Sequence, residues 1–134
     1  EHCEMILASA SASAKTILFG EHAVVYDMPA IAIPLSTLRA YARIEQDLDA
    51  AGLIIEAPDI FFSMPFSEME EIHPIGAAIS LFYKTFGRNL PANHRLSIHS
   101  DIPIASGLGS GAAVSISIFR ALSILESIEL SVCQ

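Results

Sequence analysis

Ile102-Pro103-Ile104-Ala105-Ser106-Gly107-Leu108-Gly109-Ser110-Gly111-Ala112-Ala113 is the stretch that says most about the fold and function of this chain. Its three alternating glycines stop where a strongly apolar helical pattern begins. Glycine lets the backbone approach a ligand closely, and the first turn of a helix has unpaired N–H groups at the positive end of its dipole. The stretch therefore predicts a loop that binds an anion, and phosphate is the ligand it suits best.

The loop differs from two common nucleotide-binding motifs. No Gly-Lys-Ser/Thr follows it, so it is not a P-loop, and it lacks the spacing and the acidic residue of a dinucleotide-binding fingerprint. A glycine-rich turn before a helix is also common as a plain connection, so this stretch alone leaves a purely structural explanation open.

The composition is that of a compact, folded domain. The chain has 134 residues, of which 52% are hydrophobic, and a mean hydropathy of +0.51, which excludes a disordered chain and indicates one domain or part of one. This apolar content is high for a separate domain, so we expect a further domain or a second copy, as in a homodimer, to cover part of the surface. The net charge of −8 argues against nucleic-acid and anionic-membrane partners, which need clustered Lys and Arg.

Cysteine usage and the first residues favour a cytoplasmic protein. Cys3 and Cys133 lie near opposite ends without metal-type spacing, so neither a disulfide framework nor a zinc site is indicated. Residues 5–14 are apolar like the core of a signal peptide, but acidic Glu1 and Glu4 precede them in place of a basic region. We therefore interpret them as a strand. The apolar stretches are too short to span a bilayer.

Hydrophobic periodicity predicts several strands. Residues 38–45 alternate with period two, as in a strand with one buried face. Residues 47–52 are turn-like, so residues 53–57 are expected to return as the hairpin partner of that strand. Residues 94–100 alternate again and lead directly into the glycine loop.

Two helices are also predicted, the first from Pro74 to Gly87 and the second from about Ser110 to Leu125. Ahead of the first, Ser67 and Glu70 have the spacing of a capping box. The order of strands and helices, without a repeat or linker, predicts a single α+β layer structure. The residues expected on the apolar faces are Ile75, Ala78, Ile79, Phe82 and Phe86 in the first helix and Val114, Ile118, Ala121, Leu122 and Leu125 in the second.

A second segment, residues 14–26, places Lys15, Glu21 and His22 around a short apolar strand. Through Lys15, Gly20-Glu21-His22-Ala23-Val24-Val25, Pro103 and Gly107-Leu108-Gly109-Ser110, the chain resembles the N-terminal part of the GHMP-superfamily kinases. Galactokinases have Gly-Glu-His-Thr-Asp-Tyr where this chain has Gly-Glu-His-Ala-Val-Val-Tyr, so galactose is disfavoured. The sequence most resembles the branch that phosphorylates mevalonate, and phosphomevalonate is the next alternative.

The resemblance covers about residues 8–125 and implies a fold similar to domain 2 of ribosomal protein S5. That fold has a mixed sheet, helices packed on it and a left-handed crossover. Residues 1–134 then form the N-terminal, ATP-binding domain. The family's catalytic aspartate, second magnesium-binding acid and third glycine-rich motif match no residue up to Gln134. We therefore expect a truncated chain without the C-terminal GHMP domain, which cannot turn over alone.

The activity implied by the resemblance is transfer of the γ-phosphoryl group of Mg-ATP to the 5-hydroxyl of mevalonate in isoprenoid biosynthesis. Such transfer needs charge neutralisation on the phosphates, a divalent ion and a positioned hydroxyl. Lys15 matches the family lysine beside the transferred group, and Glu21 and His22 match residues around the substrate. The residues implied to bind ATP are Ser100, Ala105, Ser106, Gly107, Leu108, Gly109, Ser110 and Gly111.

Structural alternatives accompany these assignments. The family position that matches Gly111 is commonly a serine that helps to bind Mg²⁺; Ser110 could supply that hydroxyl, or could instead cap the helix. Ser100 could cap its own backbone, Lys15 could be a solvated strand residue, and His22 could bond within a turn. The other histidines lack metal-ligand spacing and are expected on the surface: His73, His94 and His99.

Departures from the family leave a second function open. Ser13-Ala14 stands before Lys15 where the family commonly has Pro-Gly, so the chain before the lysine is expected to differ in shape. With Gly111 in place of serine, these departures also fit a non-catalytic module of the same fold that binds nucleotide or a protein partner.

Overall fold

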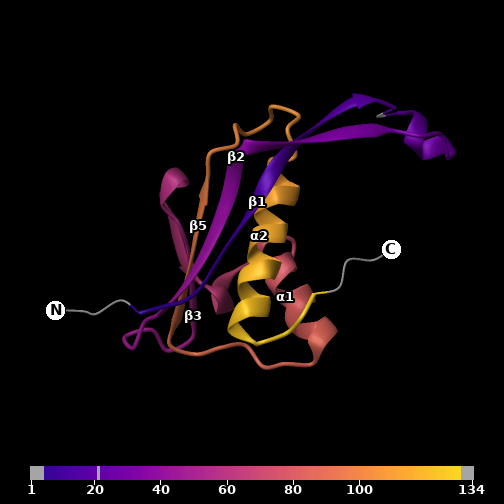
Figure 1. The fold of residues 1–134 in the computed structure, drawn as a ribbon. Helices are drawn as coiled ribbons and strands as arrows, with labels where there is room; N and C mark the ends of the chain where they lie inside the picture. The colour runs from indigo at the N-terminus through magenta and orange to yellow at the C-terminus, as the bar shows by residue number, and fades with distance from the viewer. Residues whose placement is uncertain (1–4, 21, 131–134) are drawn as a thin grey trace.

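The fold is described from a computed structural model, which covers residues 5–20 and 22–130. Three residues named in the sequence analysis lie outside the described residues: Cys3, Glu21 and Cys133. A five-stranded mixed sheet carries two α-helices on one face (Figure 1), which confirms the α+β prediction. The elements are β1 (Ile6–Phe19), η1 (Ala23–Tyr26), β2 (Ile31–Gln46), β3 (Leu53–Ala57), η2 (Pro58–Ile60), β4 (Phe62–Pro65), η3 (Phe66–Glu68), α1 (Pro74–Phe86), β5 (His94–Ser100) and α2 (Ser110–Leu125).

The strand order is β1-β2-β5-β3-β4, and β3 and β5 are its parallel pair. The predicted hairpin between residues 38–45 and 53–57 is wrong, because β5 lies between these strands and pairs with both. The short turn at residues 47–52 made a hairpin the simplest expectation. However, a parallel partner reached through α1 satisfies the ladder of β3 equally well. The left-handed sense of the crossover stays a prediction.

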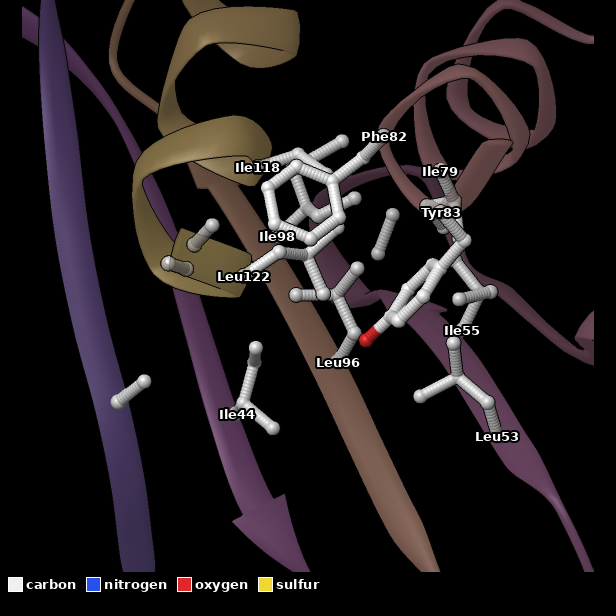
Figure 2. Close-up of a cluster of buried hydrophobic side chains, with 14 residues drawn as sticks. Ile44, Leu53, Ile55, Ile79, Phe82, Tyr83, Leu96, Ile98, Ile118 and Leu122 are labelled. Carbon is white, nitrogen blue, oxygen red and sulfur yellow. The ribbon is translucent and has the colours of Figure 1, made fainter. Parts of the chain in front are cut away.

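The core lies between the sheet and the two helices, as Figure 2 shows. Phe82 of α1 is fully buried and makes edge-on contact with Phe119 of α2 at a ring separation of 5.5 Å. Both predicted helix faces are confirmed. The fully buried large side chains that fill this layer are Phe82, Ile44, Ile55, Ile79, Leu96, Ile118 and Leu122.

The ends of α1 are defined by its flanking residues. The Nδ1 atom of His73 accepts a hydrogen bond from the Ile75 N–H at 3.3 Å, and Gly87 ends the helix with φ +62°. The predicted capping box at Ser67 is wrong. Ser67 lies inside the short 3-10 turn η3, and Pro65, which precedes that turn, makes no side-chain cap.

Beyond the sheet, β1 and β2 continue as a two-stranded ribbon, residues 15–33, which projects away from the body (Figure 1). The ribbon begins at an irregularity of β2: Ser13 pairs with Arg39, but the next residue, Ala14, pairs with Leu35. Residues 36–38 therefore bulge out of the ladder, and a bulge of this kind bends the strand that carries it. No helix in the described part of the chain is long and apolar enough to cross a membrane.

Candidate functional site

The backbone of the glycine-rich loop has the alternating conformation of an anion-binding nest. Ala105, Gly107 and Gly109 have φ values of +58°, +75° and +75°, whereas Ser106 and Leu108 between them do not have positive φ. Successive residues of alternating sign turn their N–H groups toward one side and form a concavity for negative charge. The loop also ends at the N-terminus of α2, where further N–H groups are unpaired.

Two contacts fix the loop to the body. Ile102 is 3% exposed and packs in a small cluster with alanines of β1, β2 and α2. The Ser106 hydroxyl donates to the Pro103 carbonyl oxygen at 2.7 Å, which closes the turn after that residue. The loop therefore has a buried root and an exposed tip, an arrangement that preorganises a binding loop.

Lys15 and the glycine-rich loop are brought together. The Lys15 N–H donates to the Leu108 carbonyl at 2.9 Å, which joins the base of the ribbon to the loop. Its side chain crosses Gly109 so closely that a Cβ placed on that glycine would lie 3.0 Å from Lys15 Cγ and 3.2 Å from Lys15 Cε. Gly109 is thus needed both for its positive φ and for the space that Lys15 occupies. Lys15 itself is exposed.

The strand before Lys15 is continuous. Ser13 and Ala14 belong to β1, and Ala14 is fully buried under the loop. The departure from Pro-Gly is therefore accommodated by extended backbone in β1, while the irregularity falls on the opposite strand.

At the start of α2, Gly109 occupies the N-cap position and Ser110 is the first helical residue. The alternative that Ser110 is the N-cap is therefore wrong. Gly111 is exposed, and a Cβ at this position would meet nothing within 4 Å, so the family's serine would fit there. Among the residues that the structure covers, no group of three or more His, Cys, Asp or Glu side chains could hold a metal ion.

Ser100 ends β5 and its hydroxyl accepts a hydrogen bond from the Ile102 N–H at 3.2 Å, which is the local backbone cap considered as the alternative to nucleotide binding. His22 is exposed in the turn before η1, in the segment that connects the two strands of the ribbon. The structure thus joins Lys15, but not His22, to the loop.

Gly20 fixes the backbone just before this turn. It has φ +87°, and a Cβ on it would lie 2.5 Å from the Pro29 carbonyl oxygen. The two strands of the ribbon therefore approach closely at a point where no side chain fits. This steric requirement was not evident from the sequence.

Sequence reasoning also missed a charged cluster at the start of the loop. His99 Nδ1 lies 2.7 Å from Asp59 Oδ2, and His99 Nε2 lies 3.0 Å from Asp101 Oδ1. The hydrogen bond that His99 donates to the Asp59 carboxylate raises the pKa of His99. The pKa of Asp59 is lowered, chiefly because its carboxylate accepts the Ser100 N–H and also bonds His99. Tyr41 stacks on the imidazole with a ring separation of 5.9 Å.

The two arginines nearest in sequence to the ribbon are engaged elsewhere. Arg39 donates to the Ser11 hydroxyl at 3.0 Å, and Arg43 pairs with Glu45 at 2.6 Å. Lys15 is therefore the basic side chain that the structure places against the loop.

Residues 73–133 match the family described as the GHMP kinases N terminal domain. The sheet, the two helices and the loop are thus those of a GHMP kinase N-terminal domain, and the predicted resemblance is confirmed.

The individual relatives are more specific, since they are named mevalonate kinases. Those of Pyrococcus abyssi and Pyrococcus horikoshii are each 37% identical to this chain, over 93% and 91% of its length. The crystal structure of the Methanococcus jannaschii mevalonate kinase superposes with a TM-score of 0.78 at 28% identity, covering 98% of this chain and 43% of that chain. The chain spans about two fifths of the curated relatives, 41% and 40% of their lengths.

Proposed function

We propose that this chain is the nucleotide-binding part of a mevalonate kinase, which transfers the γ-phosphoryl group of ATP to the 5-hydroxyl of mevalonate. The observation that carries the proposal is the contact between Lys15 and the glycine-rich loop. The Lys15 N–H donates to the Leu108 carbonyl, and the Lys15 side chain packs against Gly109, which has no Cβ in the way. The identity to mevalonate kinases over most of the chain supports the acceptor. In this reaction the hydroxyl oxygen forms a bond to the γ-phosphorus, the bond to the β–γ bridging oxygen breaks, and ADP and the hydroxyl proton leave.

The chain's own groups supply electrostatic stabilisation in this scheme. The N–H groups of residues 105–111 hold the phosphate oxygens, because the alternating backbone directs them to one side. The Lys15 side chain, which packs against Gly109, is proposed to neutralise charge that develops on the transferred group. His22 and Glu21 are proposed to bind the mevalonate end of the site, and Ser100 to border the nucleotide.

In the part of the chain that the structure describes, one side-chain oxygen, the Ser110 hydroxyl, is proposed as a ligand of Mg²⁺. Ser110 stands on the first turn of α2, directly after the nest, and a hydroxyl is a ligand that a hard cation accepts. Mg²⁺ usually keeps waters and binds substrate phosphates, so one hydroxyl suffices as this chain's contribution. The ion would neutralise phosphate charge. The proposal includes a cytoplasmic enzyme that acts as a homodimer and whose catalytic aspartate is none of the residues assigned above.

A nucleotide titration tests the loop and Lys15. Lys15→Met should weaken Mg-ATP binding by roughly ten- to a hundredfold, as expected for loss of a charge-assisted contact. Lys84→Met is the matched control, because Lys84 is an exposed lysine in the last turn of α1 and its loss should leave the affinity unchanged. Equal affinities of the two variants would contradict the role of Lys15.

An acceptor assay tests the substrate. The protein purified from its natural source should phosphorylate mevalonate in preference to phosphomevalonate and galactose. Binding of Mg-ATP without phosphorylation of any of the three would favour the non-catalytic nucleotide-binding module instead.

A further inference from the structure

Three consecutive backbone N–H groups hold the segment that leads into the glycine-rich loop. The Ser100 N–H donates to Asp59 Oδ2 at 3.0 Å, the Asp101 N–H to the Arg39 carbonyl at 2.9 Å, and the Ile102 N–H to the Ser100 hydroxyl at 3.2 Å. Two of these partners belong to the sheet itself. The first, Asp59, lies on η2, a turn of three residues, so its carboxylate needs a further support to keep its position.

His99 supplies that support. Its Nδ1 faces the Asp59 carboxylate at 2.7 Å and its Nε2 faces the Asp101 carboxylate at 3.0 Å. Ionised carboxylates only accept hydrogen bonds, and a neutral imidazole has a single N–H. Only the imidazolium can therefore donate to both carboxylates at once. The neutral ring would leave a nitrogen lone pair facing a carboxylate oxygen.

We propose that His99 is a positioning residue, which, as an imidazolium between Asp59 and Asp101, fixes the start of the glycine-rich loop and thereby sets its affinity for phosphate. The identification of the anion as a nucleotide phosphate rests on the proposed function; the coupling between His99 and the loop does not. Asp101 is adjacent to Ile102, the buried root of the loop, so the cluster acts where the loop leaves the sheet.

The surroundings leave the two carboxylates as the groups that control the imidazole. Tyr41 of β2 stacks on the ring. The charged side chains of neighbouring strand positions are engaged elsewhere: Arg39 with Ser11, Arg43 with Glu45, and Glu56 with Arg95.

The pH dependence has a defined sign. The pKa of His99 is raised in the folded chain, chiefly by its hydrogen bond to Asp59. The stabilisation is therefore fully present below the ordinary histidine pKa of about 6.5 and is lost as the pH rises through the raised value. The loop should loosen as the pH rises through this raised value and hold its phosphate less well above it.

Nuclear magnetic resonance on the chain tests the coupling without any nucleotide. Over a range of pH values, the ring of His99 should titrate with a midpoint above the ordinary histidine value. Loop amides should follow the same midpoint, and His99→Gln should abolish it. A ring that titrates while these amides stay unchanged would overturn the proposal. The amides to follow are those of Ser100, Asp101, Ile102, Gly107 and Gly109.

Nucleotide affinity across the same pH range gives the second measurement. Raising the pH should weaken binding to the wild-type chain by about two- to thirtyfold, the range found for residues that act through neighbours. His99→Gln should have the weaker affinity below the raised pKa of His99, and the two affinities should converge above it. His99→Arg, which keeps a cation between the carboxylates, should retain tight binding above that pKa. The control, His94→Gln, alters a histidine at the opposite end of β5 and should keep the wild-type profile.

The two proposals fail in distinguishable ways. A chain that binds no Mg-ATP at any pH contradicts the proposed function, while the amide titration still decides whether His99 positions the loop. Identical pH profiles of nucleotide binding for wild type and His99→Gln overturn the His99 proposal and leave the kinase assignment intact.

Discussion

The packed body and the end that carries the ribbon and loop are stabilised in opposite ways. In the body, Phe82 is fully buried between the two helices and the sheet (Figure 2). In the ribbon, large apolar side chains remain open: Phe19 is 70% exposed, Val25 78% and Tyr26 80%. Burial of side chains thus stabilises the body, whereas glycine geometry and backbone hydrogen bonds stabilise the end that carries the ribbon and the loop.

This difference separates stability from binding. Burial of apolar surface dominates the free energy of folding, so substitutions in the body should act on unfolding. Substitutions in the loop and ribbon should act on local geometry and on ligand affinity. The following predictions test that division, in decreasing order of expected effect on the molecule.

The largest effect is expected from Phe82→Ala. Removing a fully buried phenyl ring leaves a cavity among the residues of both helices and should lower the free energy of unfolding by about 3–5 kcal/mol. Chemical denaturation measures it. The adjacent Leu81→Ala is the matched control, because Leu81 is 57% exposed on the same helix and should cost much less. Equal losses for the two variants would show that the body is not organised around Phe82.

Next in size is a series of three glycine-to-alanine substitutions in the loop. Gly109→Ala combines a positive φ with a Cβ 3.0 Å from Lys15, so it should displace the lysine and weaken Mg-ATP binding most. Gly107→Ala has the positive φ without a close neighbour and isolates the backbone strain, of about 1–2 kcal/mol. Gly111→Ala has neither and should stabilise α2 by about 0.5–1 kcal/mol.

Isothermal titration with Mg-ATP and chemical denaturation together rank the series. An order of affinity other than Gly111→Ala above Gly107→Ala above Gly109→Ala would mean that the contact between Lys15 and Gly109 does not shape the site.

Much of the body could be predicted from the sequence because its signals are local. Pro74, Gly87 and the glycines before Ser110 set the helix bounds where the structure has them, since they act through their own backbone. The pairing of β3 was predicted wrongly. Its partner is β5, and which strand lies beside which depends on packing over the whole sheet, which a short turn does not determine.

The site was predictable in its parts but not in its assembly. The loop and Lys15 stood out as motifs, yet their mutual contact joins residues more than ninety positions apart. Asp59 lies 40 positions from His99 in the sequence, so no local pattern could predict their hydrogen bond. One signal was present: His99 and Asp101 are two residues apart at a strand end, a spacing that puts side chains on the same face.

A smaller, local effect is expected from Gly20→Ala. The new Cβ would lie 2.5 Å from the Pro29 carbonyl, so the ribbon must open around it. Hydrogen exchange of residues 16–33 should accelerate, whereas the free energy of unfolding should change little, because few side chains are buried there. Gly52→Ala, which meets no atom within 4 Å, is the control. A loss of stability approaching that of Phe82→Ala would break the division between the two regions.

The smallest expected effect is on the pH dependence of stability, which should differ between the two regions. In the body, the hydrogen bond from Arg95 lowers the pKa of Asp47. This contribution is present above the unfolded value of 3.8 and is lost as the pH falls through the lowered one. Arg95→Gln should therefore flatten the acid limb of the unfolding free energy and leave unchanged the loosening of the loop that is proposed to follow the deprotonation of His99. Denaturation at a series of pH values from about 6 down to 2 measures it; an unchanged acid limb would show that the ion pair adds no stability to the body.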